Sequence, residues 1–233
     1  MGKVFNAVYD QFMSKRPYNK YVKCYLKVSR AKRSNTILEA GCGSGLFLQA
    51  THSFGFKPDG LDIDQDMLNI AKERVDTNLY LGDITTFNLD QKWDLIYLPL
   101  DVLDYLSRSR LKKALKNLAS KLNSGGMLIF DVHGKSYLKM MQNAYSQEFS
   151  GHARYLWQSR VRGKYIHYFI TCAQEDRAEE YRLKERIHTV KELGRAASFA
   201  GLSRKGRLRA WDLGKIDRHT KRQIFVYQKK PDR

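Results

Sequence analysis

The chain has few of the residues that mark secreted or membrane-spanning proteins. Only three of its 233 residues are cysteines, and Cys24, Cys42 and Cys172 are scattered without a Cys-x-x-Cys pair. They indicate neither a disulfide framework nor a zinc site, and no metal is expected. No apolar run approaches the roughly 20 residues needed to span a bilayer, and the N-terminus lacks the apolar stretch of a signal peptide. We therefore expect a cytoplasmic protein that does not bind a membrane.

Acidic residues are also scarce, with 24 Asp and Glu against 42 Lys and Arg and a formal net charge of +18. The excess lies at the two ends of the chain. Residues 1–36 carry nine basic residues against one acid, residues 37–134 carry ten against thirteen, and residues 135–233 carry twenty-three against ten. Basic flanks of this kind attract anionic small molecules or RNA. The alternative is a solubility feature, because net charge reports association and not reaction.

A glycine-rich turn follows the first apolar run of the sequence. Residues 37–45 read Ile-Leu-Glu-Ala-Gly-Cys-Gly-Ser-Gly, and Asp62 follows a second apolar run 21 positions after Gly41. Glycines let such a turn bend sharply and approach a ligand. The Gly-x-Gly-x-Gly spacing differs from the Gly-x-Gly-x-x-Gly of dinucleotide sites, and no phosphate-binding lysine follows it. The turn therefore favours a nucleoside ligand with an amino-acid tail.

These residues resemble the first motifs of the class I S-adenosylmethionine-dependent methyltransferases. In that family the Glu-x-Gly-x-Gly-x-Gly motif binds the amino-acid part of the cofactor, and a carboxylate at the position of Asp62 binds both ribose hydroxyls. Gly82-Asp83-Ile84 resembles the adenine-binding turn. The resemblance implies S-adenosyl-L-methionine as cofactor. The cofactor-binding residues that it implies are Tyr9, Tyr21, Glu39, Ala40, Gly41, Cys42, Gly43, Asp62, Ile63, Met67, Gly82, Asp83, Ile84 and Leu98.

The residues alone leave structural alternatives open at several of these positions. Asp62 could cap a helix and Asp83 could cap a turn. Cys42 is interpreted as a small filler and not as a nucleophile. Tyr9 and Tyr21 match lid positions that close over the cofactor, although packing in a core would also suit aromatic side chains.

A narrower likeness covers most of the chain. Residues 9–13, 17–21, 101–106 and 130–133 resemble a bacterial branch of small methyltransferases that have an N-terminal helical lid and an antiparallel β insert before the last helix. Two residues depart from the pattern of this branch. Tyr21 stands where Trp is usual, and Asp104 stands where Asn is usual.

Short apolar runs alternate with helical patterns between residues 36 and 131. The pattern predicts strands at 36–40, 57–62, 79–82, 93–98 and 126–131, and helices at 45–54, 66–76 and 108–123. This order is typical of right-handed βαβ units in a mostly parallel sheet, which binds ligands at the carboxyl ends of its strands. With the resemblance, the expected fold class is α/β: a Rossmann-like, seven-stranded, mostly parallel sheet with an N-terminal helical lid and a small antiparallel β cap.

Four parts are expected along the chain. They are a helical lid at 1–35 that is interrupted at Pro17, a cofactor-binding core at 36–134, a β insert at 135–190, and the last helix and C-terminal strands at 191–233. The insert shows β-rich runs at 155–161, 165–172 and 181–188, followed by a helix at 190–200 and a strand at 223–228. In the third run, alternate residues from Arg182 to His188 form one basic face, opposite Tyr181, Leu183 and Glu185.

Two residues after strand ends are candidates for catalysis. His133 could act as a base, and Asp101 could orient the acceptor or the cofactor amine; a loop histidine bonded to backbone is the alternative. Tyr105, Arg186 and His188 are expected to contact the substrate. Methyl transfer requires mainly alignment and exclusion of water, so a strong catalytic signature is not required.

The sequence supports two enzymatic functions. The first is methyl transfer to O or N of a small, anionic acceptor. The second is RNA methylation, because residues 203–222 contain eight Lys and Arg with Trp211 among them. The stretch after the fourth strand, Leu98-Pro99-Leu100-Asp101, lacks the Asn-Pro-Pro-Tyr type of motif that accompanies methylation of base amines. A non-enzymatic cofactor sensor is a third interpretation, and a monomer or a homodimer is equally compatible with the sequence.

Overall fold

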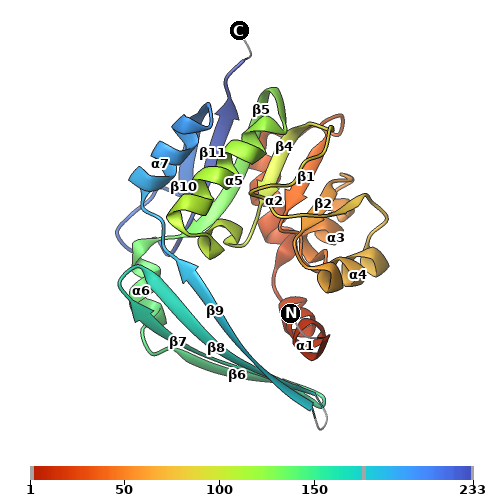
Figure 1. Cartoon of the computed structure of the whole chain (residues 1–233), viewed down its shortest axis with the longest axis vertical. Coiled ribbons are helices and arrows are strands. Elements are labelled where there is room, and N and C mark those ends of the chain that lie inside the picture. Colours follow the sequence, from red (N-terminus) through yellow and green to blue (C-terminus); the bar gives the residue numbers. More distant parts are fainter. Residues whose placement is uncertain (1–2, 175–176, 232–233) are drawn as a thin grey trace.

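The computed structural model describes residues 3–174 and 177–231, with a seven-stranded sheet at its centre (Figure 1). The strand order is β10-β11-β5-β4-β1-β2-β3. Neighbouring strands from β3 to β5 pair in parallel, and β11 pairs antiparallel with both β5 and β10. The expected Rossmann-like, mostly parallel sheet is thus confirmed. Its strands are β1 (Ile37–Ala40), β2 (Asp59–Asp62), β3 (Leu79–Leu81), β4 (Trp93–Leu98), β5 (Leu122–His133), β10 (Leu202–Arg209) and β11 (Arg222–Lys229).

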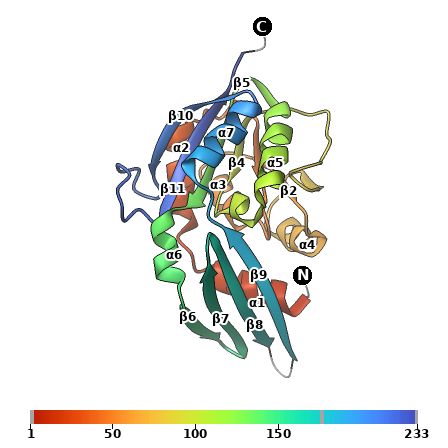
Figure 2. The ribbon, with the colours of Figure 1, turned by 60° about the vertical axis from the view of Figure 1, so that its left-hand side comes forward.

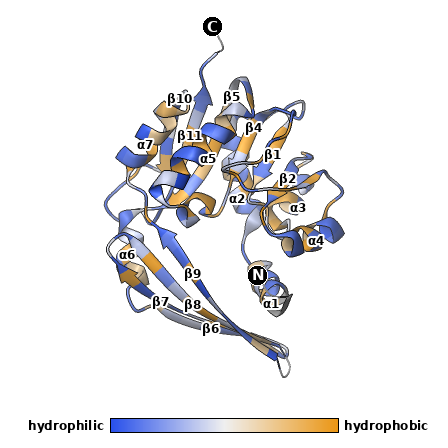
Figure 3. Cartoon of the chain, in the orientation of Figure 1, coloured by the Kyte–Doolittle hydropathy of each residue, from blue (hydrophilic) through white to orange (hydrophobic). Residues whose placement is uncertain are grey.

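Helices cover both faces of this sheet, whose central strands carry many apolar residues (Figure 3). These residues are buried on both sides of the sheet. Leu38 and Ile96 pack with α5 (Arg108–Ser120) and α7 (Val190–Phe199). Their neighbours Ile37 and Leu95 point the other way, toward α2 (Tyr18–Ser29) and α3 (Leu46–Ser53). The remaining core helices are α4 (Gln65–Arg74) and the short 3₁₀ helix η1 (Val102–Tyr105). Burial on both faces holds the sheet in place. Because β1, β2 and β4 run parallel, their carboxyl ends lie at the same edge of the sheet.

A second, antiparallel sheet lies below the core in Figure 1 and forms the expected cap. Its strands, in spatial order, are β6 (Tyr145–Ser150), β7 (Ala153–Arg162), β8 (Tyr165–Gln174) and β9 (Arg177–Arg186), and α6 (Lys135–Met141) leads into them. Helix α1 (Lys3–Met13) lies against this sheet (Figure 2). Phe5, Val8 and Phe12 are buried there against Tyr155 and Ile170. The N-terminal helix and the insert thus form one cover over the core.

The structure corrects several element predictions. Helix α6 and strand β6 were not predicted, and β10 was interpreted only as a basic stretch. Strand β10 is the edge of its sheet, carries basic residues toward solvent and contains a bulge between Arg204 and Gly206, so its apolar alternation is weak. Helix α5 ends at Ser120 instead of residue 123, and β5 begins at Leu122, because residue Leu122 already pairs with Trp93.

The proposed division of the chain at residues 35, 134 and 190 stays a prediction. Residues 1–2 and 232–233, which belong to its first and last parts, lie outside the described residues, as do residues 175–176 of the insert. Among the helices that the structure describes, none is long and apolar enough to cross a membrane. All three cysteines are free and buried.

Candidate active site

A cavity of about 540 Å³ opens at the carboxyl ends of β1, β2 and β4, under α1. This volume is in the range of small-molecule sites. The cavity brings together eleven of the fourteen expected cofactor-binding residues: Tyr9, Glu39, Gly41, Cys42, Gly43, Asp62, Ile63, Met67, Gly82, Asp83 and Ile84. The other three do not line it. Ala40 and Leu98 are fully buried in the core, and Tyr21 stacks on Trp211 at 4.1 Å between ring centroids.

The glycine turn places backbone N–H groups and a carboxylate at the cavity wall. Gly41 has a positive φ of 81°, and a Cβ there would lie 2.7 Å from Val102. Gly43 also has a positive φ, of 53°, but a Cβ there would meet no atom within 4 Å. The Gly43 N–H donates to Asp62 Oδ2 at 2.7 Å, and the Asp64 N–H donates to Oδ1 at 2.9 Å. These bonds fix the orientation of the Asp62 carboxylate before any ligand binds.

Glu39 provides a buried carboxyl group whose Oε2 has no hydrogen-bond partner among the described residues. Burial, followed by the charge of Asp62, raises the pKa of Glu39 well above its usual value. An unpaired polar group in such a place costs free energy unless a ligand satisfies it. A ligand that carries positive charge next to a nucleoside fits this wall, and S-adenosylmethionine has both a sulfonium and an ammonium group.

Asp83 lines the same cavity, but its carboxylate already has partners. It accepts a hydrogen bond from the Thr85 N–H at 2.8 Å and forms an ion pair with Arg110 at 2.6 Å. Burial raises the pKa of Asp83, but these hydrogen bonds outweigh burial and the net shift is downward. Asp83 therefore caps its turn, as the sequence analysis left open. The backbone of this turn is the part that is available to a ligand.

An ion pair ties α1 to the core at the rim of the cavity. Arg74 of α4 donates to both carboxylate oxygens of Asp10, at 3.1 and 2.8 Å, and also to the carbonyl oxygen of Ser44. Bidentate pairs of this kind are stronger and more directional than single contacts. The pair holds Tyr9, one position before Asp10, over the cavity.

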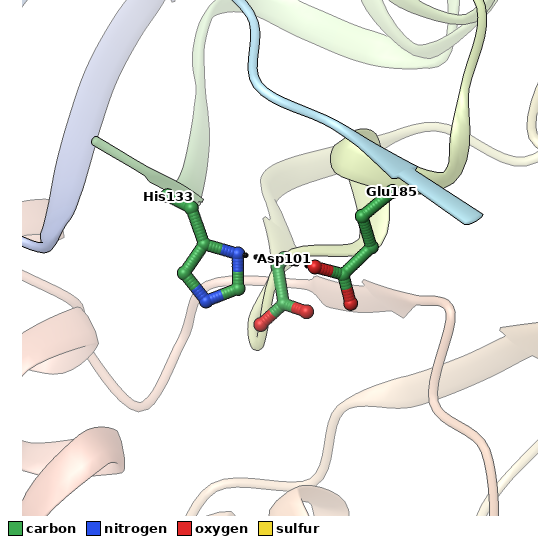
Figure 4. Close-up of side chains that lie close together, drawn as sticks. All are labelled: Asp101, His133 and Glu185. Carbon is green, nitrogen blue, oxygen red and sulfur yellow. Dashed lines mark ion pairs between the residues drawn. The ribbon is translucent and has the colours of Figure 1, made fainter. Parts of the chain in front are cut away.

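A second cavity of about 290 Å³ continues from the first toward the cap. Tyr9, Leu100 and Tyr105 line both cavities, so Tyr105 lies at their junction, and its contact with the substrate stays a prediction. Asp101, His133, Glu185 and Arg222 lie on the far wall. Figure 4 shows that the first three point toward one another from the loop after β4, the end of β5 and strand β9.

Asp131 and Arg222 hold this far wall in place. Asp131 is fully buried and accepts the backbone N–H groups of Leu100 and Asp101 at 2.7 and 3.2 Å. Both of those residues have positive φ, near 60°, which is strained for residues other than glycine. The Arg222 guanidinium contacts the carboxylates of Asp101 and Asp131, and its Nη2 lies 2.7 Å from His133 Nε2.

The surroundings give the groups of this wall different proton affinities. Burial and Arg222 lower the pKa of His133, but Asp101, Asp104 and Glu185 outweigh them and raise it to about 9. Its Nδ1 lies 3.1 Å from Asp104 and 3.5 Å from Glu185. Because Arg222 occupies the Nε2 side, the imidazole keeps a proton on Nδ1 at neutral pH.

The carboxyl groups of Asp101 and Glu185 on this wall also differ in their pKa values. Burial raises the pKa of Asp101, but Arg222 and His133 outweigh burial, so the net shift is downward and Asp101 is ionised. Burial, followed by the charge of Asp101, raises the pKa of Glu185. Groups with pKa values pushed apart are typical of acid–base sites. Glu185 is therefore the carboxyl group on this wall whose pKa is raised, beside one whose pKa is lowered.

Arg186 and His188 do not lie where the sequence analysis expected them. His188 is buried with Nε2 3.1 Å from the Leu103 carbonyl oxygen, and its Nδ1 lies 2.6 Å from Arg186. Arg186 forms an ion pair with Glu192 of α7 at 2.7 Å. Neither side chain lines a described cavity. They attach the end of β9 to the core, since β9 turns inward at this point.

Sequence reasoning missed three residues that line or hold the far wall. Glu185 was noted only as one member of an alternating strand, and Asp131 only as part of the 130–133 segment. Arg222 was counted in a basic stretch. A charged residue on the apolar face of a strand was the available signal for Glu185, because such a residue needs a buried partner.

Comparison with known proteins agrees with this geometry. Residues 37–126 match the methyltransferase domain family. The Bacillus subtilis protein YqeM, named as a candidate methyltransferase, is 28% identical over 66% of this chain and 65% of its own length. A Streptomyces venezuelae enzyme, named dTDP-3-amino-3,4,6-trideoxy-alpha-D-glucopyranose N,N-dimethyltransferase, is 30% identical over 44% of each chain. The chain thus spans between two fifths and two thirds of the length of these curated relatives.

Solved structures show the same fold over nearly the whole chain. An S-adenosylmethionine-dependent methyltransferase from Clostridium acetobutylicum is 20% identical and has a TM-score of 0.84, covering 97% of this chain and 98% of that one. The sugar N-methyltransferase KedS8 from Streptoalloteichus is 18% identical, with a TM-score of 0.78 over 95% of this chain and 92% of that one. The chain thus contains a match to the methyltransferase domain over residues 37–126, and its fold is that of solved S-adenosylmethionine-dependent methyltransferases.

Proposed function

We propose that this protein transfers the methyl group of S-adenosylmethionine to N or O of a small acceptor held in the 290 Å³ cavity. The observation that carries the proposal is the junction of two cavities, with a nucleoside-type wall on one side and the buried carboxyl group of Glu185 on the other. The relatives named as sugar N-methyltransferases support a small acceptor. RNA stays the alternative, and the small volume of the second cavity, about 290 Å³, favours the small molecule.

The cofactor supplies an activated methyl group on sulfur. The acceptor atom forms a bond to this methyl carbon while the carbon–sulfur bond breaks and its electron pair stays on sulfur. The chain has to align the acceptor, exclude water and take up one proton. Tyr9 and the cap exclude water, and ionised Asp101 orients the acceptor.

Glu185 is the proposed proton acceptor. The sequence analysis assigned this role to His133, whose Nε2 faces the permanently charged Arg222 at 2.7 Å. His133 instead positions Glu185 and Asp104 through Nδ1. Tyr168 donates to Glu185 Oε2 at 2.9 Å, which fixes the carboxyl group at the wall of the acceptor cavity.

The test is formation of S-adenosylhomocysteine with a panel of amino sugars and hydroxylated analogues. With an accepted substrate, Glu185→Gln should reduce kcat by about 10²-fold or more while binding of S-adenosylhomocysteine is unchanged. Glu180→Gln is the matched control, because Glu180 is an exposed residue of the same strand. Full activity of Glu185→Gln would contradict the assignment of the base. Salt-sensitive methylation of RNA, with none of any small molecule, would replace the proposed acceptor class.

A further inference from the structure

A third cavity, of about 430 Å³, lies behind Arg222 and has no part in the reaction proposed above. It is built by the end of β10, the loop 210–221 and the start of β11. His133, Tyr137 and Arg222 line both this outer cavity and the acceptor cavity. The His133 and Tyr137 rings are stacked at 3.7 Å. The two cavities thus adjoin and share these three residues as lining.

The outer cavity has a basic wall. Arg209, Lys221 and Arg222 line it, with Asp217 as its one acidic lining residue in the part of the chain that the structure describes. Arg209 is held by Asp212 at 2.8 Å and by Asp217 at 3.4 Å. Lys221 is exposed and has no ion-pair partner among residues 3–174 and 177–231. The wall thus offers one free ammonium group beside two guanidinium groups whose positions are fixed.

An aromatic surface adjoins these cations. Trp211 lines the cavity and stacks on Tyr21 at 4.1 Å, and the Arg222 guanidinium lies 5.8 Å from the Trp211 ring. The backbone φ of Trp211 is 72°, which is strained for a residue other than glycine. Cations beside an aromatic face suit a phosphate group and the ring that carries it.

We propose that the outer cavity binds the phosphate group of a phosphorylated acceptor, whose amine or hydroxyl reaches Glu185 in the acceptor cavity. The inference rests on the proposed function, and it names the class of acceptor as a phosphorylated small molecule. It also gives the basic stretch at 203–222 a specific role. Only part of that stretch lines the cavity, since Arg204, Lys205 and Arg207 lie on the edge strand β10 outside it.

That division of the basic stretch provides the test. Inorganic pyrophosphate is titrated into the full-length protein saturated with S-adenosylhomocysteine, and binding is followed by calorimetry and by tryptophan fluorescence. Lys221→Ala should weaken pyrophosphate binding about tenfold, because one close charge-assisted contact is lost. Lys205→Ala removes the same charge outside the cavity and should change binding by less than twofold. Trp211→Phe should remove most of the fluorescence change while pyrophosphate still binds.

Two results would overturn the inference. One is equal weakening by Lys221→Ala and Lys205→Ala, which would indicate only the general field of a basic protein and would favour an extended polyanion such as RNA. The other is no pyrophosphate binding to protein that binds S-adenosylhomocysteine. In that second case the cofactor site and the proposed methyl transfer stand, and only the phosphate subsite fails.

Discussion

Removal of the Asp62 carboxylate should weaken cofactor binding by about two orders of magnitude. In the structure its two oxygens accept the Gly43 and Asp64 N–H groups at 2.7 and 2.9 Å, and the carboxylate stands at the cavity wall. We propose that the same oxygens accept the two ribose hydroxyls of the cofactor. Hydrogen bonds to a charged group contribute about 1.5–3 kcal/mol each. Loss of both should cost about 3 kcal/mol, or about 100-fold in Kd, for Asp62→Ala.

Asp62→Asn should fall between the wild type and Asp62→Ala. The amide keeps one oxygen but turns an NH₂ group toward a donor, so the loss should be about tenfold. Calorimetry with S-adenosylhomocysteine measures all three proteins, and circular dichroism checks that each is folded. Asp66→Asn is the control, since it removes a charge from the first turn of α4 without lining the cavity. A folded Asp62→Ala protein that binds within threefold of the wild type would refute the reasoning.

Three further outcomes are expected. Gly43→Ala should fold, at a cost in stability of about 1–2 kcal/mol because residue 43 has a positive φ. It should bind S-adenosylhomocysteine at least tenfold more weakly, because the new methyl group enters the cavity. Unchanged binding would show that the turn does not approach the ligand. Burial raises the pKa of Asp104 to about 7, so this carboxyl group costs stability progressively as pH rises from about 4 through 7. Asp104→Asn should therefore gain about 1–3 kcal/mol over the wild type at pH 8 and less at pH 5 in urea unfolding, and a gain that did not depend on pH would contradict the buried-charge account. Arg74→Ala should free α1 and speed amide exchange over residues 5–13, with cofactor affinity about tenfold lower; exchange as slow as in the wild type would mean that the cap alone holds the helix.

The cofactor side of the site could be predicted from the sequence because its determinants are local. A glycine turn directly after a buried strand has few possible conformations, and the ends of parallel strands meet at one edge. Gly41, Gly43 and Asp62 therefore follow from their order in the chain. Ala40 and Leu98 failed as lining residues because in a strand buried on both faces, sequence does not say which side chains end inside the core.

The acceptor side could not be predicted in the same way. Glu185 and His133 are 52 positions apart in the sequence and meet only because β9 returns to the end of β5. The pKa of His133 also depends on Arg222, which comes later still. The strand alternation correctly separated Glu185 from the basic face, but it gave Arg186 and His188 a substrate role when β9 in fact turns into the core beside Leu103. The positions of these side chains depend on long-range packing, which no local sequence pattern predicts.

The cover formed by α1 and the β insert also has a consequence for how the chain folds. The Phe5 N–H donates to a carboxylate oxygen of Glu179, 174 positions away, and Gln11 donates to Ser150, 139 positions away. Contacts between such distant segments form slowly, because the chain entropy of a long loop is lost before the contact gains anything. On a ribosome, α1 emerges first and has to wait for β7 and β8 before its apolar face is covered. The opening strands of the core can meanwhile assemble, so the cofactor pocket gains its α1 roof only after β7 and β8 have formed.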